Sequence, residues 1–236
     1  MTVAWSFTRL DCFESCPAKY WYQYVTKRYP FVENEHTTRG NAAHSTIEAR
    51  LKTKASLRTS ALAVNEKTRT SIEWLEQLLL VYESLPASAT HVELEVALTD
   101  QYTQCHWMAK NCRHRAKIDF LILSLDGTHA LVVDWKTGRH YPAKVIDQAS
   151  DYAMCVLALF PGVRHIDAQF VYLDDRSVHD YKFTFKDNPV IRETFELRAA
   201  DLQASYDNNH WPVKPSDNGC RFCSANVPGG CPSGVR

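Results

Sequence analysis

The chain has 236 residues, of which 45% are hydrophobic and 23% are charged, so it is long enough to form one sizeable core. Its longest apolar runs, such as Ala153 to Phe160, are too short to cross a bilayer, and its first residues do not resemble a secretory signal. We therefore expect a cytoplasmic protein with no membrane partner. The 27 basic residues balance 27 acidic ones, which does not favour a nucleic-acid binder but does not exclude one, because local basic clusters matter more than the total.

The first third of the chain is predicted to be helical. Residues 6–28 form an aromatic-rich helical segment that Pro17 is expected to break or kink. Residues 37–53 are expected to form a second helix, and residues 66–83 a third, amphipathic helix that Pro86 ends.

Strands follow this helical part. Residues 92–98 alternate apolar and acidic side chains, which is typical of a half-buried strand, and part of 103–109 is expected to form another. Residues 116–125 and 129–135 are apolar runs separated by Asp126-Gly127, a strong signal of a hairpin. Because both faces of these two runs are apolar, we expect them to be interior strands.

The remainder of the chain returns to helix and strand and then loses its periodicity. A helix is predicted over 143–159, strands over 166–174 and 178–185, and a last helix over 188–208. The tail from 211 onward is rich in Pro, Gly and Cys. This order predicts one α/β or α+β domain. Its expected parts are a helical part over 1–90, a core over 91–208 and a cysteine-rich tail over 209–236.

The predicted hairpin gathers three charged residues on one face. A two-residue turn at Asp126-Gly127 sets a register that places Asp119 opposite Asp134, and the period of two puts Lys136 on the same face. The opposite face is expected to carry apolar side chains, namely Ile118, Phe120, Ile122, Leu131 and Val133.

This arrangement indicates a metal site. Two carboxylates directly opposite each other destabilise a sheet, and burial makes their repulsion more costly. A divalent cation between Asp119 and Asp134 would relieve the repulsion, and oxygen ligands suit Mg²⁺ or Mn²⁺. Lys136 would then orient a water or stabilise a phosphate, which indicates metal-assisted phosphodiester hydrolysis. The alternative is a buried ion-pair network in which Lys136 neutralises both aspartates.

On these residues the chain resembles the PD-(D/E)XK nuclease superfamily, and within it the RecB-like exonuclease branch. Asp134-Trp135-Lys136 matches the D-x-K motif, and Asp119 matches the preceding acidic position. Further matches follow the order of the branch's motifs: SFTRLDCFESCPAKY over 6–20, the helix histidine His44, and Gln148 with Tyr152 as Q-x-x-x-Y.

The resemblance implies a restriction-endonuclease-like fold, in which a mixed sheet is flanked by helices and residues 91–208 form the nuclease core. It implies that Mg²⁺ or Mn²⁺ is held by His44, Asp119, Asp134 and the backbone carbonyl of Trp135. Lys136 would orient the attacking water, and Gln148 and Tyr152 would position DNA. Glu93 or Glu95 is a further acidic candidate, and the sequence does not choose between them.

The cysteines suggest a second metal site. Cys220, Cys223 and Cys231 lie in a tail with no evident core, so a bound metal or cluster would explain how the tail is ordered. The chain resembles the CRISPR-associated RecB-type and AddB iron–sulfur nuclease domains. In those domains the first cysteine that binds the cluster lies in the N-terminal helix, and the other three lie at the C-terminus. This resemblance implies a [4Fe–4S] cluster held by Cys16, Cys220, Cys223 and Cys231. Zinc is the alternative, with Cys12, Cys16 or His210 as the fourth ligand.

The function implied by the resemblance is a DNA exonuclease that acts at DNA ends or on single strands, in recombination, repair or DNA processing. Its host would be a prokaryote or a phage, and it would act in the cytoplasm, as a homo-oligomer or with recombination or CRISPR partner proteins. One alternative is a DNA-binding or adaptor component of a recombination or spacer-acquisition complex. Another is a sequence-specific restriction endonuclease, against which the Q-x-x-x-Y motif and the cysteine tail argue.

Overall fold

The computed structural model describes residues 2–57 and 71–233, and its centre is a five-stranded sheet with the order β1-β2-β3-β4-β5. The strands are β1 (Ala87–Leu98), β2 (His114–Ser124), β3 (His129–Lys136), β4 (His165–Tyr172) and β5 (Ser177–Thr184). Strands β3 and β4 run parallel, whereas the other neighbouring pairs are antiparallel. The predicted mixed sheet is therefore confirmed, and β2 and β3 are interior strands as expected.

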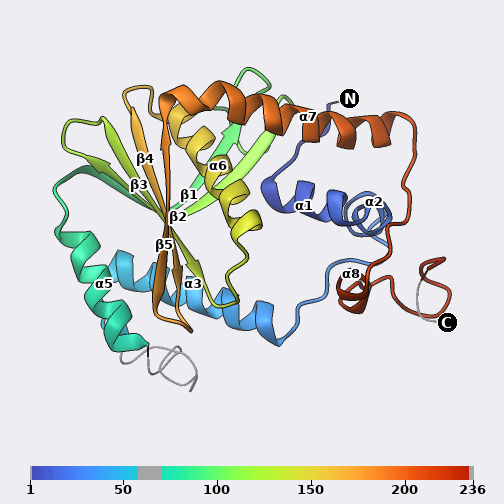
Figure 1. Ribbon diagram of the computed structural model, residues 1–236, viewed down its shortest axis with the longest axis horizontal. Helices are drawn as coiled ribbons and strands as arrows, with labels where there is room; N and C mark the ends of the chain where they lie inside the picture. The colour runs from blue at the N-terminus through green and yellow to red at the C-terminus, as the bar shows by residue number, and fades with distance from the viewer. Residues whose placement is uncertain (1, 58–70, 234–236) are drawn as a thin grey trace.

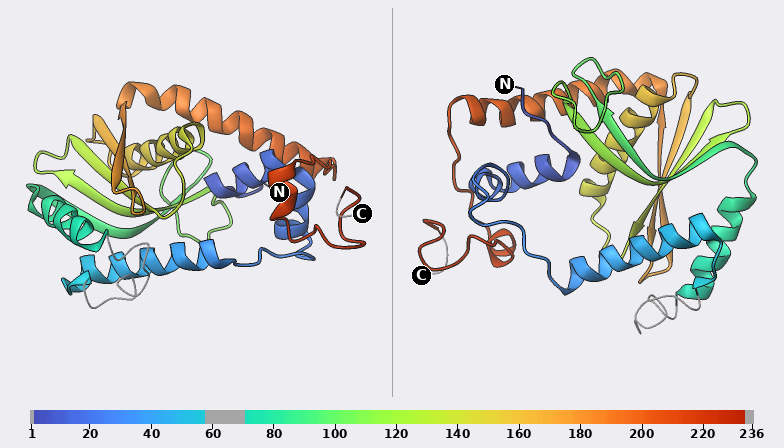
Figure 2. Two further views of the ribbon diagram at one scale, coloured as in Figure 1. Left: turned by 60° about the horizontal axis from the view of Figure 1, so that its bottom comes forward. Right: turned by 180° about the vertical axis from the view of Figure 1, so that it is seen from behind.

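Helices cover both faces of this sheet, as Figures 1 and 2 show. One face is covered by α3 (Glu35–Thr53) and α5 (Ile72–Ser84), and the other by α1 (Phe7–Ser15), α6 (Pro142–Leu159) and α7 (Asn188–Asp207). The predicted third helix begins at Ile72, and residues 66–70 of that prediction lie outside the described residues. This layout confirms the predicted flanking of the sheet by helices.

The N-terminal helical segment is broken at the predicted place. Cys16 has an extended backbone, with φ −166°, and Pro17 starts the short helix α2 (Pro17–Tyr20), since proline is favourable in a first helical turn. One turn of π-helix, Trp21–Val25, follows. The break lets the chain turn so that α2 lies beside the C-terminal tail, which contains α8 (Asp217–Arg221) (Figure 1).

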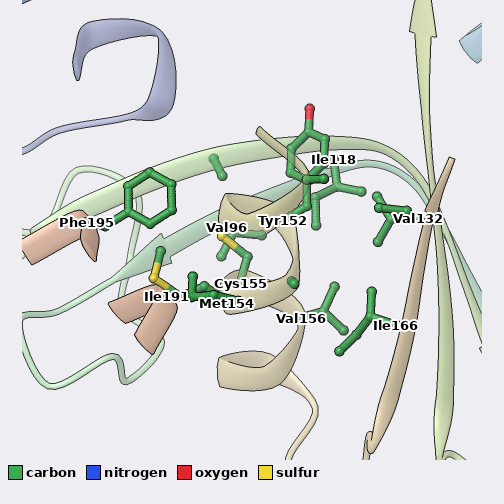
Figure 3. Close-up of a cluster of buried hydrophobic side chains, with 14 of the residues drawn as sticks. Val96, Ile118, Val132, Tyr152, Met154, Cys155, Val156, Ile166, Ile191 and Phe195 are labelled. Atoms are coloured by element: carbon green, nitrogen blue, oxygen red, sulfur yellow. The ribbon is translucent and has the colours of Figure 1, made fainter. Parts of the chain in front are cut away.

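Two hydrophobic cores result, one on each face of the sheet. The first core joins the sheet to α1, α6 and α7, and Figure 3 shows part of it around Val132, Tyr152 and Phe195. The second core joins the sheet to α3 and α5 and includes Ile47, Leu79 and Trp135. Each fully buried large aliphatic side chain contributes roughly 1.5–3 kcal/mol, so the sheet is fixed from both sides. No helix among the described residues is long and apolar enough to span a membrane.

The hairpin between β2 and β3 has the predicted register but a longer loop. Phe120 pairs with Val133, which is the register that sets Asp119 against Asp134. The expected two-residue turn is wrong, because β2 ends at Ser124 and β3 starts at His129. The Asp126 carboxylate accepts hydrogen bonds from the Ser124 hydroxyl at 2.6 Å and from the backbone N–H of Thr128 at 3.0 Å, and these bonds stabilise a four-residue loop. Two- and four-residue loops give the same pairing, so the register is unaffected.

The strand expected within 103–109 is absent from the described structure. This stretch belongs to a loop between β1 and β2 that forms only an isolated bridge, between Leu98 and Gln104. Tyr102 has φ 59°, and the Thr99 and Thr103 side chains bond to each other at 2.7 Å, so the chain turns back immediately after β1. Pairing with β1 stops after this bridge and the bond from the Cys105 N–H to the Ala97 carbonyl at 2.9 Å, so no strand forms in this stretch.

Candidate active site

Asp119 and Asp134 lie where β2 and β3 separate. The backbone ladder of the two strands ends at the Phe120–Val133 pair. Beyond it, the backbone N–H of Trp135 donates to Oδ2 of Asp119 at 2.9 Å, so a side-chain carboxylate takes the place of a strand carbonyl. Asp119 is 7% exposed and Asp134 is 2% exposed. The sequence therefore places two buried acids at the end of a paired section of the sheet.

The Asp134 carboxylate is held by three of the predicted site residues. Its Oδ1 accepts hydrogen bonds from the Tyr152 hydroxyl at 2.6 Å and from Gln148 Nε2 at 3.1 Å, while Lys136 Nζ lies 2.6 Å from Oδ2. Lys136 also donates to Gln148 Oε1 at 3.0 Å. The ammonium group is thereby fixed between an acid from β3 and an amide from α6.

Asp119 faces a different set of groups, from α3 and β1. His44 Nδ1 lies 3.2 Å from Asp119 Oδ2. One ligand atom from each of His44, Glu93 and Asp119 lies within 4.8 Å of the other two. The side chain of Glu93 is 10% exposed, whereas Glu95 is an exposed residue. Of the two glutamates that the sequence left open, Glu93 is thus the one beside the predicted ligands.

The backbone at Glu93 explains how β1 brings a carboxylate to this place. Glu93 has φ 55°, in the left-handed region that residues with a side chain rarely adopt and that clusters at functional sites. The paired residues Val92 and Phe120 pack in the second core, whereas the paired residues Leu94 and Ile118 pack in the first. The side chains of both strands therefore change sides of the sheet between these two pairs. The predicted face of Ile118 is wrong, since the sequence shows no break in the alternation that would reveal this change.

Burial and charge shift the protonation equilibria of the site. Burial and the charge of Asp134 raise the pKa of Asp119, although His44 and the Trp135 N–H act in the opposite direction. Burial lowers the pKa of His44, but its hydrogen bond and charge interaction with Asp119 outweigh burial and raise the pKa above its usual value. Burial and the nearby carboxylates also raise the pKa of Tyr152 well above its usual value, so its hydroxyl remains a hydrogen-bond donor at neutral pH.

The groups on the α3 side suit a hard divalent cation. Two carboxylates and an imidazole converge there, and oxygen-rich sites of this kind fit Mg²⁺ or Mn²⁺. The repulsion that raises the pKa of Asp119 is the repulsion that a cation would relieve. A cavity of about 310 Å³ reaches these groups. Its lining residues are Asn41, His44, Ser45, Glu48, Glu93, Lys117 and Asp119.

The short helices α2 and α8 lie at the end of the molecule away from the sheet (Figure 1), and four cysteines from this region line one pocket. One pocket is lined by Cys16, Cys220, Cys223 and Cys231, the four that the sequence grouped. The Cys16 sulfur accepts the backbone N–H of Lys214 at 3.4 Å, which ties the N-terminal helices to the tail. Neither Cys12 nor His210 lines this pocket. Cys12 instead donates to Gln23 Oε1 at 3.4 Å, and burial raises its pKa to about 11.

The fold and these groups agree with one family. Residues 4–227 match the family model of the PD-(D/E)XK nuclease superfamily. The chain therefore belongs to the PD-(D/E)XK nuclease superfamily, whose members are nucleases that depend on divalent metals and act on nucleic acids.

Among solved structures, the chain is similar to the crystal structure of SSO0001, at 13% sequence identity and a TM-score of 0.42. The match covers 99% of this chain and 88% of that chain. None of the curated proteins compared with the chain matches it.

Sequence reasoning missed one part of the site neighbourhood. The basic run Arg113–Lys117 was visible, but the structure divides it between two roles. Arg113 and His114 are buried, and Arg113 donates to the Val3 carbonyl at 2.5 Å. Arg115 and Lys117 instead line a second cavity beside Gln148 and Tyr152. The alternation of cationic residues at every second position of a strand was the available signal.

Proposed function

We propose that the protein is a Mg²⁺- or Mn²⁺-dependent deoxyribonuclease that hydrolyses phosphodiester bonds at DNA ends or on single strands. The observation that carries this proposal is the separation of β2 and β3 at two buried acids, with Lys136 Nζ 2.6 Å from Asp134 Oδ2. A purely structural ion pair would not need His44 and Glu93 to converge on Asp119 from two further elements.

Each residue has a distinct role in this proposal. His44, Asp119 and Asp134 would hold the cation, with Glu93 as an additional carboxylate and the Trp135 carbonyl as a further oxygen. When bound, the cation neutralises charge that develops on the phosphate and makes water a stronger nucleophile.

The amine of Lys136 provides a hydrogen-bond donor at a fixed position, because Asp134 and Gln148 restrain it. Such a donor orients a water and stabilises charge on a phosphate oxygen. Gln148 and Tyr152 act in support by fixing Asp134, and Gln148 also faces the second cavity, where DNA would be positioned.

The test of this function is the cleavage of labelled DNA by purified protein. Lys136→Ala should lower the rate by about 10²–10⁴-fold, because a positioned proton-transfer or charge-stabilising group contributes that much. Lys186→Ala removes an exposed lysine and should cleave like the wild type. Wild-type cleavage should require Mg²⁺ or Mn²⁺ and stop in EDTA. Undiminished cleavage by Lys136→Ala, or cleavage in EDTA, would contradict the mechanism.

The choice of substrate separates the exonuclease from the alternatives. Linear single strands labelled at either end, linear duplex and covalently closed circles should be compared. We expect products only from substrates with an end, and cleavage of closed circles would favour an endonuclease. Binding without cleavage of any substrate would favour the DNA-binding or adaptor role within a recombination or spacer-acquisition complex.

We propose that the cysteine pocket holds a [4Fe–4S] cluster rather than zinc. Four thiolates around one zinc ion, with Zn–S near 2.3 Å, would bring their sulfurs to about 3.8 Å of one another. Among the described residues, these thiols form no group of three ligand atoms within 4.8 Å. The four cysteines line one pocket, and four thiolates are the ligand set of a [4Fe–4S] cluster, which supports this assignment.

Anaerobic purification tests this assignment. The protein should be brown and contain iron and acid-labile sulfide, and Cys16→Ser should lose colour and iron. Cys12→Ser is the matched control, because Cys12 lies outside the pocket, and it should keep both. Stoichiometric zinc without sulfide would reject the cluster.

A further inference from the structure

A second cavity, of about 360 Å³, lies next to the candidate active site on the face of the sheet that α1 and α6 cover. It is formed by the segment that begins α1, the loop between β1 and β2, strand β2 itself and one turn of α6. Its lining residues are Trp5, Ser6, Phe7, Thr8, Arg9, Trp107, Arg115, Ala116, Lys117, Gln148, Asp151 and Tyr152. The volume is at the lower end of the range for small-molecule sites, about 300–1,000 Å³.

The wall of this cavity is cationic. Arg9 and Arg115 contribute positive charge, as does Lys117, whose ammonium group also pairs with Glu93 Oε2 at 2.5 Å outside the lining. Asp151 is the one acid among the lining residues. Asp151 is 1% exposed, and its Oδ1 lies 2.8 Å from His114 Nε2, so its carboxylate is turned toward a buried partner. The cavity therefore presents positive potential to a ligand, which favours an anion such as a phosphate.

An aromatic ring is fixed beside these cations. Arg115 Nε donates to the backbone carbonyl of Trp107 at 2.8 Å, and the Arg115 guanidinium lies 5.7 Å from the centre of the Trp107 ring. Trp107 is half-buried, although it belongs to an exposed loop that contains Met108, which is 73% exposed. Such a combination of an aromatic face and a guanidinium is the arrangement that proteins use to bind unpaired bases and their phosphates.

The cavity shares residues with the active site. Gln148 and Tyr152 line it and also bond to Asp134. Lys117 lines both this cavity and the one that reaches Asp119. A nucleic-acid strand whose phosphate lies at the two acids would therefore place an adjacent nucleotide in this cavity.

We propose that this cavity binds one unpaired nucleotide of single-stranded DNA, with the base against Trp107 and the flanking phosphates at Arg115, Lys117 and Arg9. The inference rests on the proposed nuclease function and names its substrate, since a cavity of this volume accepts one nucleotide but not a base pair. Specificity for unpaired DNA then comes from the enclosure of the base. Phosphate contacts alone would not supply it, because they bind single strands and duplexes alike.

The test is binding of fluorescent DNA with Ca²⁺ in place of Mg²⁺ or Mn²⁺, so that affinity is measured without relying on cleavage. Base stacking contributes about 1–3 kcal/mol per base, so Trp107→Ala should weaken binding of a short oligothymidylate by about 5- to 150-fold. Binding of a blunt duplex should not change. Trp107→Phe should recover part of the affinity, and Met108→Ala, in the same loop, should bind like the wild type.

A second variant tests the phosphate contact. Arg115→Gln should lower the slope of log affinity against log salt by about 0.7 for single strands. Equal loss of single-strand and duplex binding in Trp107→Ala would overturn the proposal, as would wild-type single-strand binding by that variant.

The two proposals can fail separately. If the wild type cleaves DNA but Trp107→Ala binds single strands normally, the nucleotide site is wrong and the nuclease stands. If the wild type shows the expected Trp107-dependent binding but cleaves no DNA with Mg²⁺ or Mn²⁺, the nuclease is wrong and the site stands. Melting curves of each variant separate lost binding from lost folding.

Discussion

Replacing Tyr152 with phenylalanine removes one hydroxyl group from the buried environment of Asp134. That hydroxyl donates to Asp134 Oδ1 at 2.6 Å and accepts from Gln148 Nε2 at 2.8 Å. Tyr152 is 4% exposed, and phenylalanine offers no donor in place of the lost hydroxyl. We expect the acid to lose part of its alignment while the aromatic packing of the residue remains.

The size of the effect follows from the kind of hydrogen bond. A hydrogen bond to a charged group contributes about 1.5–3 kcal/mol. If the bond holds Asp134 in its reactive orientation, kcat should fall by about 10- to 150-fold, at 1.36 kcal/mol per factor of ten. KM should change little, because Tyr152 acts on the acid and not on the bulk of the DNA. The melting temperature should fall by about 3–12 °C, at about 2–4 °C per kcal/mol for a chain of this size.

The assay is single-turnover and steady-state cleavage of an end-labelled single strand with saturating Mn²⁺. Tyr141→Phe is the matched control, because Tyr141 begins the same helical segment but is 60% exposed. It should retain the wild-type rate. A Tyr152→Phe variant with the wild-type kcat would refute the view that this hydroxyl positions Asp134, and a rise in KM alone would assign Tyr152 to substrate binding.

Two further changes test parts of the fold. Burial raises the pKa of Glu83, but the ion pairs with Arg50 and Lys54 outweigh burial and lower the pKa below its usual value of 4.5. The stabilisation from these ion pairs is therefore complete above pH 4.5 and is lost as the pH falls through the lowered pKa. Glu83→Gln should therefore lower the free energy of unfolding, measured by urea denaturation, by about 1–2 kcal/mol at neutral pH and by much less in acid. An equal loss of stability at neutral and acid pH would contradict this role of Glu83. Gly127 has φ +68° and open space around its Cβ position, so Gly127→Ala should cost about 1 kcal/mol in thermal melts, while Gly138→Ala, without positive φ, should not destabilise.

The register of the central hairpin was predictable because it depends on a repeated pattern. Several apolar residues on each strand must all face a core, and a slip by one residue would turn every one of them to the wrong face. The loop was not predictable to the same degree, because the Asp126 side chain can complete either a short or a longer turn. The register that sets Asp119 against Asp134 depends on this pattern, so the error in the loop did not change the register.

The position of Glu93 could not be predicted, for a local physical reason. The sequence shows an unbroken alternation through Val92, Glu93 and Leu94, and alternation predicts a regular strand. The left-handed backbone at Glu93 is held by its surroundings, including an ion pair with Lys117 at 2.5 Å, and these groups come from other elements. A strained residue of this kind persists only when the tertiary structure imposes it, so no local pattern announces it.

The three residues of the Asp134-Trp135-Lys136 motif each have a separate structural reason to occupy their place. Asp134 faces the first core, where α6 supplies the groups that hold its carboxylate. Trp135 points the other way, is 1% exposed in the second core, and uses its backbone N–H to hold Asp119. Lys136 returns to the face of Asp134 and reaches the same carboxylate. A shift by one residue would bury the amine and expose the tryptophan, so both cores oppose it, and the spacing of acid and amine is fixed by packing as well as by chemistry.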